Sequence, residues 1–123
     1  MLRKFFLIST LAGALLALDP KVVTEAQAMT KAGKHTEAIA LLEGALKTSP
    51  KDAVAIKAAL ASANLALGDA TMANEQLPPR GKYPVALRAY RKVLEYDKTN
   101  KKATDNIAMI EGIYKQMGRP VPQ

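Results

Sequence analysis

Cysteine is absent from this chain of 123 residues, and histidine occurs once. Without cysteine there is no disulfide, no zinc site built on thiolates and no thiol nucleophile. Because His35 is the only histidine, a metal site would need carboxylates alone, and the sequence contains no such cluster. The length suits one small domain with a single core.

Motifs of common enzyme classes are also missing. The serines Ser9, Ser49 and Ser62 lie outside any G-x-S-x-G or S-x-x-K context. Gly68 and Gly81 lack the spaced glycines and the following Ser or Thr of a phosphate-binding loop. Packing at a turn before a helix explains His35 better than catalysis does. We therefore expect no enzyme activity, no cofactor and no metal.

The first residues, MLRKFFLISTLAGALLAL (1–18), have the layout of a secretory signal. Arg3 and Lys4 precede an apolar run of about 14 residues, which is shorter than the roughly 20 that a membrane-spanning helix needs. A buried N-terminal helix is the alternative. We expect residues 1–18 to be a signal peptide or an N-terminal membrane anchor. The protein would then be exported, periplasmic or anchored in a bacterial inner membrane.

Two small-x-small triplets are candidate cleavage sites, Ala12-Gly13-Ala14 and Ala26-Gln27-Ala28. Cleavage at the second would remove part of the first predicted helix of the domain. We therefore favour the first site or an uncleaved anchor. Ala14 occupies the position where a lipoprotein carries its cysteine, which excludes lipidation there.

Two segments of the chain resemble each other. GKHTEAIALLEGALKTSP (33–50) aligns with GKYPVALRAYRKVLEYDK (81–98), sharing the initial glycine and lysine and the apolar positions that follow. In both, apolar residues recur three or four positions apart, which is typical of an amphipathic helix. No stretch alternates with period two, so we expect no sheet.

These residues resemble the tetratricopeptide repeat (TPR), a helix-turn-helix unit of 34 residues. Its pattern, W-x2-L-G-x2-Y, then A-x3-F and P, falls on Val22, Glu25, Ala26, Met29, Ala38, Leu42 and Pro50. The small residues are kept, whereas the aromatics and the leucine are replaced. A second unit starts at Ala53, and a third, near Lys101, has one helix only. The resemblance, to a small exported bacterial type of TPR protein, implies an all-α fold: a right-handed α-α superhelix of about two and a half units.

N-cap residues and prolines predict the helix boundaries. Asp19, Asp52 and Asn100 precede helical runs, and Pro20 and Pro84 suit first-turn positions. We predict helices at 20–32, 36–48, 53–66 or beyond, 84–96 and 101–117. The helical domain then spans 19–117, and a tail follows at 118–123. Because stacked repeats need about three units, two and a half imply marginal stability, dimerisation or a stabilising ligand.

The stretch GDATMANEQLPPRGKYP delays the second helix of the second unit and forms an insertion at 68–83. One interpretation continues the preceding helix through Leu77 until Pro78 and Pro79 stop it, with Gly68 costing about 1 kcal/mol relative to alanine. The other ends the helix at Gly68 and makes the rest a loop. We favour the longer helix. A specific role for the insertion and a tolerated spacer remain open alternatives.

Basic residues are concentrated in the C-terminal part, where positions 80–123 carry ten basic and four acidic side chains. A polyanion-binding module, for nucleic acid or anionic lipid, is therefore the alternative function. Its candidate basic face is Arg80, Lys82, Arg88, Arg91 and Lys92. Tyr90 and Tyr114 lie on apolar helix faces, so we predict that they are core residues rather than stacking platforms. Nucleic acid is not the favoured partner, whereas contact with a membrane surface is compatible with the sequence.

TPR proteins are generally adaptors, whose first helices line a concave groove that holds a segment of another protein. The resemblance therefore implies a non-catalytic scaffold that binds a protein or peptide, with self-association as a further possibility. The exposed positions of the first helices would line the groove: Gln27, Lys31, Lys57, Asn64, Lys102 and Asn106. Some members clamp a C-terminal carboxylate with Lys, Asn and Arg, but Val23, Ala58 and Ala61 interrupt that set here. We do not predict that specificity.

Overall fold

The computed structural model describes residues 19–123, so the expected signal or anchor at 1–18 lies outside the described residues. The described part contains no strand, which confirms the all-α prediction. A 3-10 turn, η1 (Pro50–Asp52), precedes the third helix. The helices are α2 (Lys21–Lys31), α3 (His35–Thr48), α4 (Ala53–Ala73), α5 (Pro79–Tyr96) and α6 (Lys101–Gln116).

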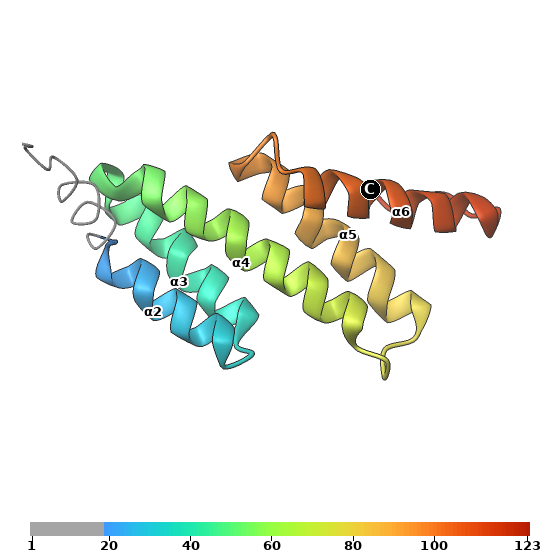
Figure 1. The fold of residues 1–123 in the computed structure, drawn as a ribbon, viewed down its shortest axis with the longest axis horizontal. Coiled ribbons are helices and arrows are strands. Elements are labelled where there is room, and N and C mark those ends of the chain that lie inside the picture. The colour runs from blue at the N-terminus through green and yellow to red at the C-terminus, as the bar shows by residue number, and fades with distance from the viewer. Residues whose placement is uncertain (1–18) are drawn as a thin grey trace, which may run out of the picture.

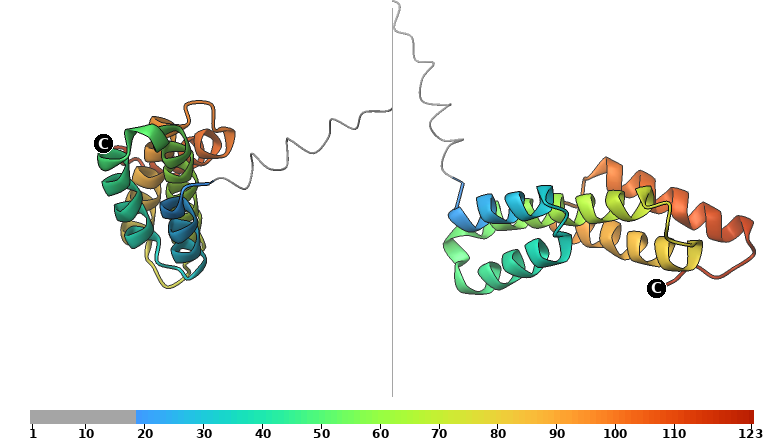
Figure 2. Two further views of the ribbon diagram at one scale, coloured as in Figure 1. Left: turned by 90° about the vertical axis from the view of Figure 1, so that its left-hand side faces the viewer. Right: turned by 90° about the horizontal axis from the view of Figure 1, so that it is seen from below.

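Helix α4 joins two hydrophobic cores into one elongated molecule (Figure 1). The first core packs α2 and α3 against the first half of α4, with Leu42 and Ile56 completely buried. The second packs α5 and α6 together and against the rest of α4, around Tyr90 and Ile110. Figure 2 shows the same arrangement from two further directions. Tyr96 contacts both cores.

Of the three predicted N-caps, one makes a capping hydrogen bond. The side chain of Asn100 accepts a hydrogen bond from the backbone N–H of Ala103 at 2.9 Å, which confirms the predicted N-cap of α6. Asp52 occupies the N-cap position of α4, but its side chain makes no capping bond. The predictions for Asp19 and Pro20 are wrong, because Pro20 itself is the N-cap residue of α2.

The segment 68–83 folds as extensions of two helices. Helix α4 continues past Gly68, as favoured from the sequence, but it ends at Ala73 before the prolines are reached. The predicted start of α5 at Pro84 is wrong, because α5 begins at Pro79 and Pro84 lies inside it. Pro79 occupies the first turn, where a missing N–H costs nothing. The loop between α4 and α5 is therefore short.

Gly68 and Asp69 tie α4 to α5 and α6. A Cβ at Gly68 would lie 2.6 Å from the Tyr90 ring, so the aromatic ring packs directly on the glycine backbone. The hydroxyl of Tyr90 donates to Asp69 Oδ1 at 2.7 Å, and Lys102 Nζ lies 2.6 Å from Asp69 Oδ2. Burial and the hydrogen bond to Asp69 raise the pKa of Tyr90 above its ordinary value. Tyr90 and Tyr114 are both buried, which confirms that they are core residues.

The C-terminal tail folds back onto the second core. Helix α6 ends at Gln116, one residue before the predicted end, and Gly118 follows with a positive φ of 64°. Val121 then packs against the core, and Arg91 Nη1 donates to the carbonyl of Pro122 at 2.7 Å. The sequence predicts a tail at 118–123 but does not indicate that it packs on the core.

Candidate binding grooves

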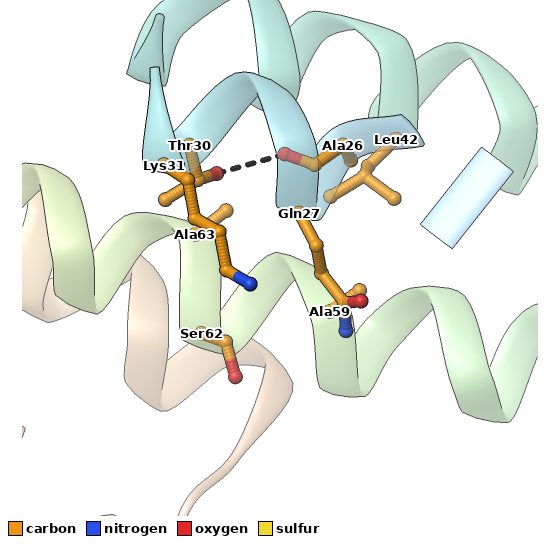
Figure 3. Close-up of a pocket in the computed structure, with 8 residues that line it drawn as sticks. All are labelled: Ala26, Gln27, Thr30, Lys31, Leu42, Ala59, Ser62 and Ala63. Carbon is orange, nitrogen blue, oxygen red and sulfur yellow. Dashed lines mark hydrogen bonds between the residues drawn. The ribbon is translucent and has the colours of Figure 1, made fainter. Parts of the chain in front are cut away.

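The first concavity, of about 200 Å3, lies between α2 and α4. Figure 3 shows Gln27 and Lys31 reaching from α2 towards α4. The alanines at 26, 59 and 63 leave space between the two helices, and Leu42 of α3 completes the apolar lining. The hydroxyl of Thr30 donates to the carbonyl of Ala26 at 2.9 Å, so it is already occupied within the helix. The opening is apolar inside and polar along its edge.

A second concavity, of about 530 Å3, continues along α4 to the turn between α5 and α6. Ser62 lines both concavities, so together they form one groove along α4. The second part contains Lys57, Leu65 and Tyr96, and Val54 is 86% exposed at its edge. Asp97, its acidic residue, accepts hydrogen bonds from Thr99 and Asn100. We call the two concavities together the α4 groove.

The α4 groove contains two lysines and one carboxylate, that of Asp97, so its net charge is positive. Lys31 and Lys57 are exposed, and neither forms an ion pair with any residue between 19 and 123. The groove therefore combines an apolar lining with two free ammonium groups. Such a surface favours a ligand that has apolar side chains and carries negative charge or carbonyl oxygens.

The predicted groove residues divide into three groups. Gln27, Lys31 and Lys57 line the α4 groove. Lys102 and Asn106 lie on α6 outside it, and Lys102 is paired with Asp69. The expectation that Asn64 is exposed is wrong, because its side chain is buried and its Nδ2 donates to the carbonyl of Leu60 at 2.8 Å. It lies on another face of α4, flanked by α3 and α5.

Sequence reasoning missed most of the apolar lining. Ala59, Leu65 and Tyr96 line the α4 groove but are not among the residues predicted for it. Small residues at 26, 59 and 63, which face one another across the two helices, were the available signal. The contribution of the α5–α6 turn depends on tertiary packing and has no local signature.

The five candidate basic residues differ in the contacts that they make. Arg91 is bound to the tail, and Lys92 is paired with Glu95 at 2.9 Å. That hydrogen bond is the main cause that raises the pKa of Lys92. Arg88 lines a groove with Glu43, whereas Arg80 lies near Arg119 at the far end of the molecule. Lys82 lines neither of these hollows. Arg88 and Lys92 therefore lie beside the same hollow, whereas Arg80 lies apart from them.

Between residues 19 and 123 no group of three or more His, Cys, Asp or Glu side chains is placed to hold a metal ion. The Nδ1 atom of His35 is buried without a hydrogen-bond partner, at the first turn of α3.

Within the part of the chain that the structure describes, one helical stretch, Pro50–Ala73, is long and apolar enough to cross a membrane by length and composition alone. The core helices of water-soluble proteins meet the same criterion. Here α4 is the helix that both cores share, and 33% of its apolar window is buried.

Comparison with known proteins gives no match to this chain among family profiles, curated proteins or solved structures.

Proposed function

We propose that this protein is a non-catalytic, TPR-like scaffold that binds a segment of another protein along the α4 groove. The observation that carries the proposal is the groove itself, where two concavities meet at Ser62 and three of the residues expected from the sequence line the walls. An apolar surface with convergent polar groups at its edge is typical of a ligand-binding site.

The helix order supports the TPR-like part of the proposal. Helices α2 and α3 pair as one unit and α4 and α5 as the next, and α2 also contacts α4. In this interpretation α6 is the first helix of a third unit. The chain would then be a short right-handed superhelix, with the long α4 and the early start of α5 as its main departures from a minimal repeat.

The groove dimensions suit an extended or irregular segment with small apolar side chains. The part between α2 and α4 is the narrower one, because Gln27 and Lys31 reach over it. The part near Lys57 is wider and more polar. A bound segment would place apolar side chains against the alanines and Leu42, and polar groups near the two lysines.

The proposed location is the periplasm or the outer face of an inner membrane, and it rests on the composition of residues 1–18. N-terminal sequencing of the natural protein after cell fractionation tests it. Recovery from the envelope fraction is the expected result. Recovery from the cytosol with an intact N-terminus would overturn it.

Co-purification from envelope extracts tests the binding proposal. Replacement of both Lys31 and Lys57 by alanine should release the partner, because the two free ammonium groups are lost from the groove. The matched control replaces Lys47 and Lys98, which are exposed and lie outside the groove. Equal retention of the partner by both double variants would show that the groove is not the binding site.

A further inference from the structure

A separate groove of about 370 Å3 lies on another face of α4, between α3 and α5. Its floor is formed by Leu67 and the buried Asn64. Ile39 of α3 and Val85 of α5 make its sides apolar. The groove shares no lining residue with the α4 groove. We call it the α3–α5 groove.

Small side chains keep the α3–α5 groove open. Ala40 of α3 and Ala89 of α5 line it from its two sides. One turn further along α3, Gly44 has no atom within 4 Å of where a Cβ would stand. The α3 side of the groove is thus bordered by a low ridge that another helix can approach closely.

The two walls carry opposite charges. Glu43 projects from α3, and Arg88 projects from α5. Both are exposed, and between residues 19 and 123 neither takes part in an ion pair. Lys92 also lines the α5 wall, but it is paired with Glu95. The free charges are therefore one carboxylate on the α3 wall and one guanidinium on the α5 wall.

We propose that the α3–α5 groove is a self-association surface, occupied by the same surface of a second copy of this chain. The argument is geometric. When two copies face each other across a twofold axis that runs along the groove, α3 of each copy lies opposite α5 of the other. Glu43 of one copy then faces Arg88 of its partner, and the reverse contact follows by symmetry. Two ion pairs close over an apolar strip.

The charges also select this axis over the other face-to-face arrangement. A twofold axis across the groove would place α3 opposite α3, so that Glu43 meets its own copy and Arg88 meets its own copy. Like charges would then repel at two places. Ala40 and Gly44 favour close approach of the second copy in either case, and so the charges alone decide the orientation.

Self-association is independent of binding in the α4 groove, which faces away from this surface. It also supplies a way to stabilise a chain of about two and a half repeat units, since repeat arrays gain stability from each additional packed neighbour. The alternative occupant is an amphipathic helix of a different protein. In that case, mixing the charge variants described below would not restore association between copies of this chain.

Sedimentation velocity of the full chain at low salt tests the proposal. The wild-type protein should dimerise at micromolar concentration. Glu43→Arg and Arg88→Glu should each weaken the dimer by roughly tenfold, because every affected ion pair is replaced by a repulsion. The controls Glu37→Arg and Lys98→Glu make the same charge changes outside the groove and should dimerise as the wild type does.

Mixing the two groove variants gives the decisive result. Glu43→Arg has two positive walls and Arg88→Glu has two negative walls, so the mixture should form a heterodimer with near wild-type affinity, detected by native mass spectrometry. The double variant Glu43→Arg/Arg88→Glu should regain the homodimer. Circular dichroism checks that each variant is folded. A monomeric wild type, or weakened variants that mixing does not rescue, would overturn the proposal and indicate a different occupant or none.

Discussion

The contact between Gly68 and Tyr90 shows how a single missing side chain shapes this fold. Tyr90 is buried and packs directly against the backbone of α4, so closely that only glycine fits at position 68. The next residue, Asp69, holds the tyrosine hydroxyl and also Lys102 of α6. Two adjacent residues of α4 therefore fix where α5 and α6 pack.

Gly68→Ala should destabilise the protein although alanine is the better helix former. The added Cβ would lie 2.6 Å from the Tyr90 ring, and overpacking of this kind costs about 1–3 kcal/mol. Gly112→Ala is the matched control, because a Cβ on that helical glycine meets nothing within 4 Å, and it should stabilise the protein by up to about 1 kcal/mol. Urea unfolding measures both. Equal stabilisation by the two variants would contradict the Tyr90 contact.

The raised pKa of Tyr90 predicts a loss of stability at alkaline pH. Burial and the hydrogen bond to Asp69 favour the neutral phenol in the folded state. The folded pKa is thus above the unfolded value of about 10, so this stabilisation is complete below pH 10 and is lost as the pH rises further. The free energy of unfolding should fall less steeply above pH 10 in Tyr90→Phe than in the wild type. Parallel slopes would show that Tyr90 does not carry this pH dependence.

At the scale of elements, α5 is longer than the sequence predicts. Helix α5 begins five residues before Pro84, at Pro79. Tyr83 lies in that first part and packs edge-to-face on Tyr114 of α6, with ring centroids 6.5 Å apart. This aromatic contact stabilises the helical conformation of the residues before Pro84, which Pro84 by itself disfavours.

Pro84→Ala should therefore stabilise the protein. Pro84 lacks the N–H that would donate to the carbonyl of Arg80 within α5, and an interior proline costs up to about 3 kcal/mol relative to alanine. Because the site is close to the start of the helix, we expect a gain of about 1 kcal/mol in urea unfolding. Pro79→Ala, at the first turn, serves as the control and should change stability by less than about 0.5 kcal/mol. A neutral or destabilising effect of Pro84→Ala would show that packing of the proline ring contributes more stability than the missing hydrogen bond costs.

Removal of the tail after Gly118 should destabilise the second core. It deletes Val121, which packs on that core, and the carbonyl of Pro122 that accepts from Arg91. Partial burial of a valine and one charge-assisted hydrogen bond together suggest a loss of about 1–3 kcal/mol. Val121→Ser keeps the hydrogen bond and should lose only part of this amount. An unchanged melting temperature in the truncated protein would mean that the tail is not bound in solution.

The sequence predicted elements that depend on local chemistry and missed those that depend on packing. Three features could be predicted from the local sequence: the Asn100 cap, the apolar faces around Tyr90 and Tyr114, and the continuation of α4 past Gly68. The start of α5 was not, because a contact with α6 overrides the proline. Asn64 was wrongly predicted to be exposed in the groove, because α3 and α5 flank it. That position results from tertiary packing, which helical periodicity does not predict.

At the scale of the whole molecule, one helix carries both cores and borders both grooves. The α4 groove opens between α2 and the α5–α6 turn, and the α3–α5 groove opens on another face. Sequence reasoning placed Gln27, Lys31 and Lys57 in the α4 groove. It could not anticipate that Arg91 would bind the tail and Lys92 would pair with Glu95. Nor could it place Arg80 in a different hollow from Arg88.

Site-specific photo-cross-linking tests the central claim, that a segment of another protein binds along the α4 groove. A photoreactive residue in place of Ser62, where the two concavities meet, should capture one partner in cells. Adding Lys31→Ala and Lys57→Ala to the same chain should reduce that capture. The same residue at Lys47, exposed on α3 and outside both grooves, is the control. Capture from Ser62 but not from Lys47 is the predicted result. Equal capture from both positions, or none from Ser62, would contradict the account.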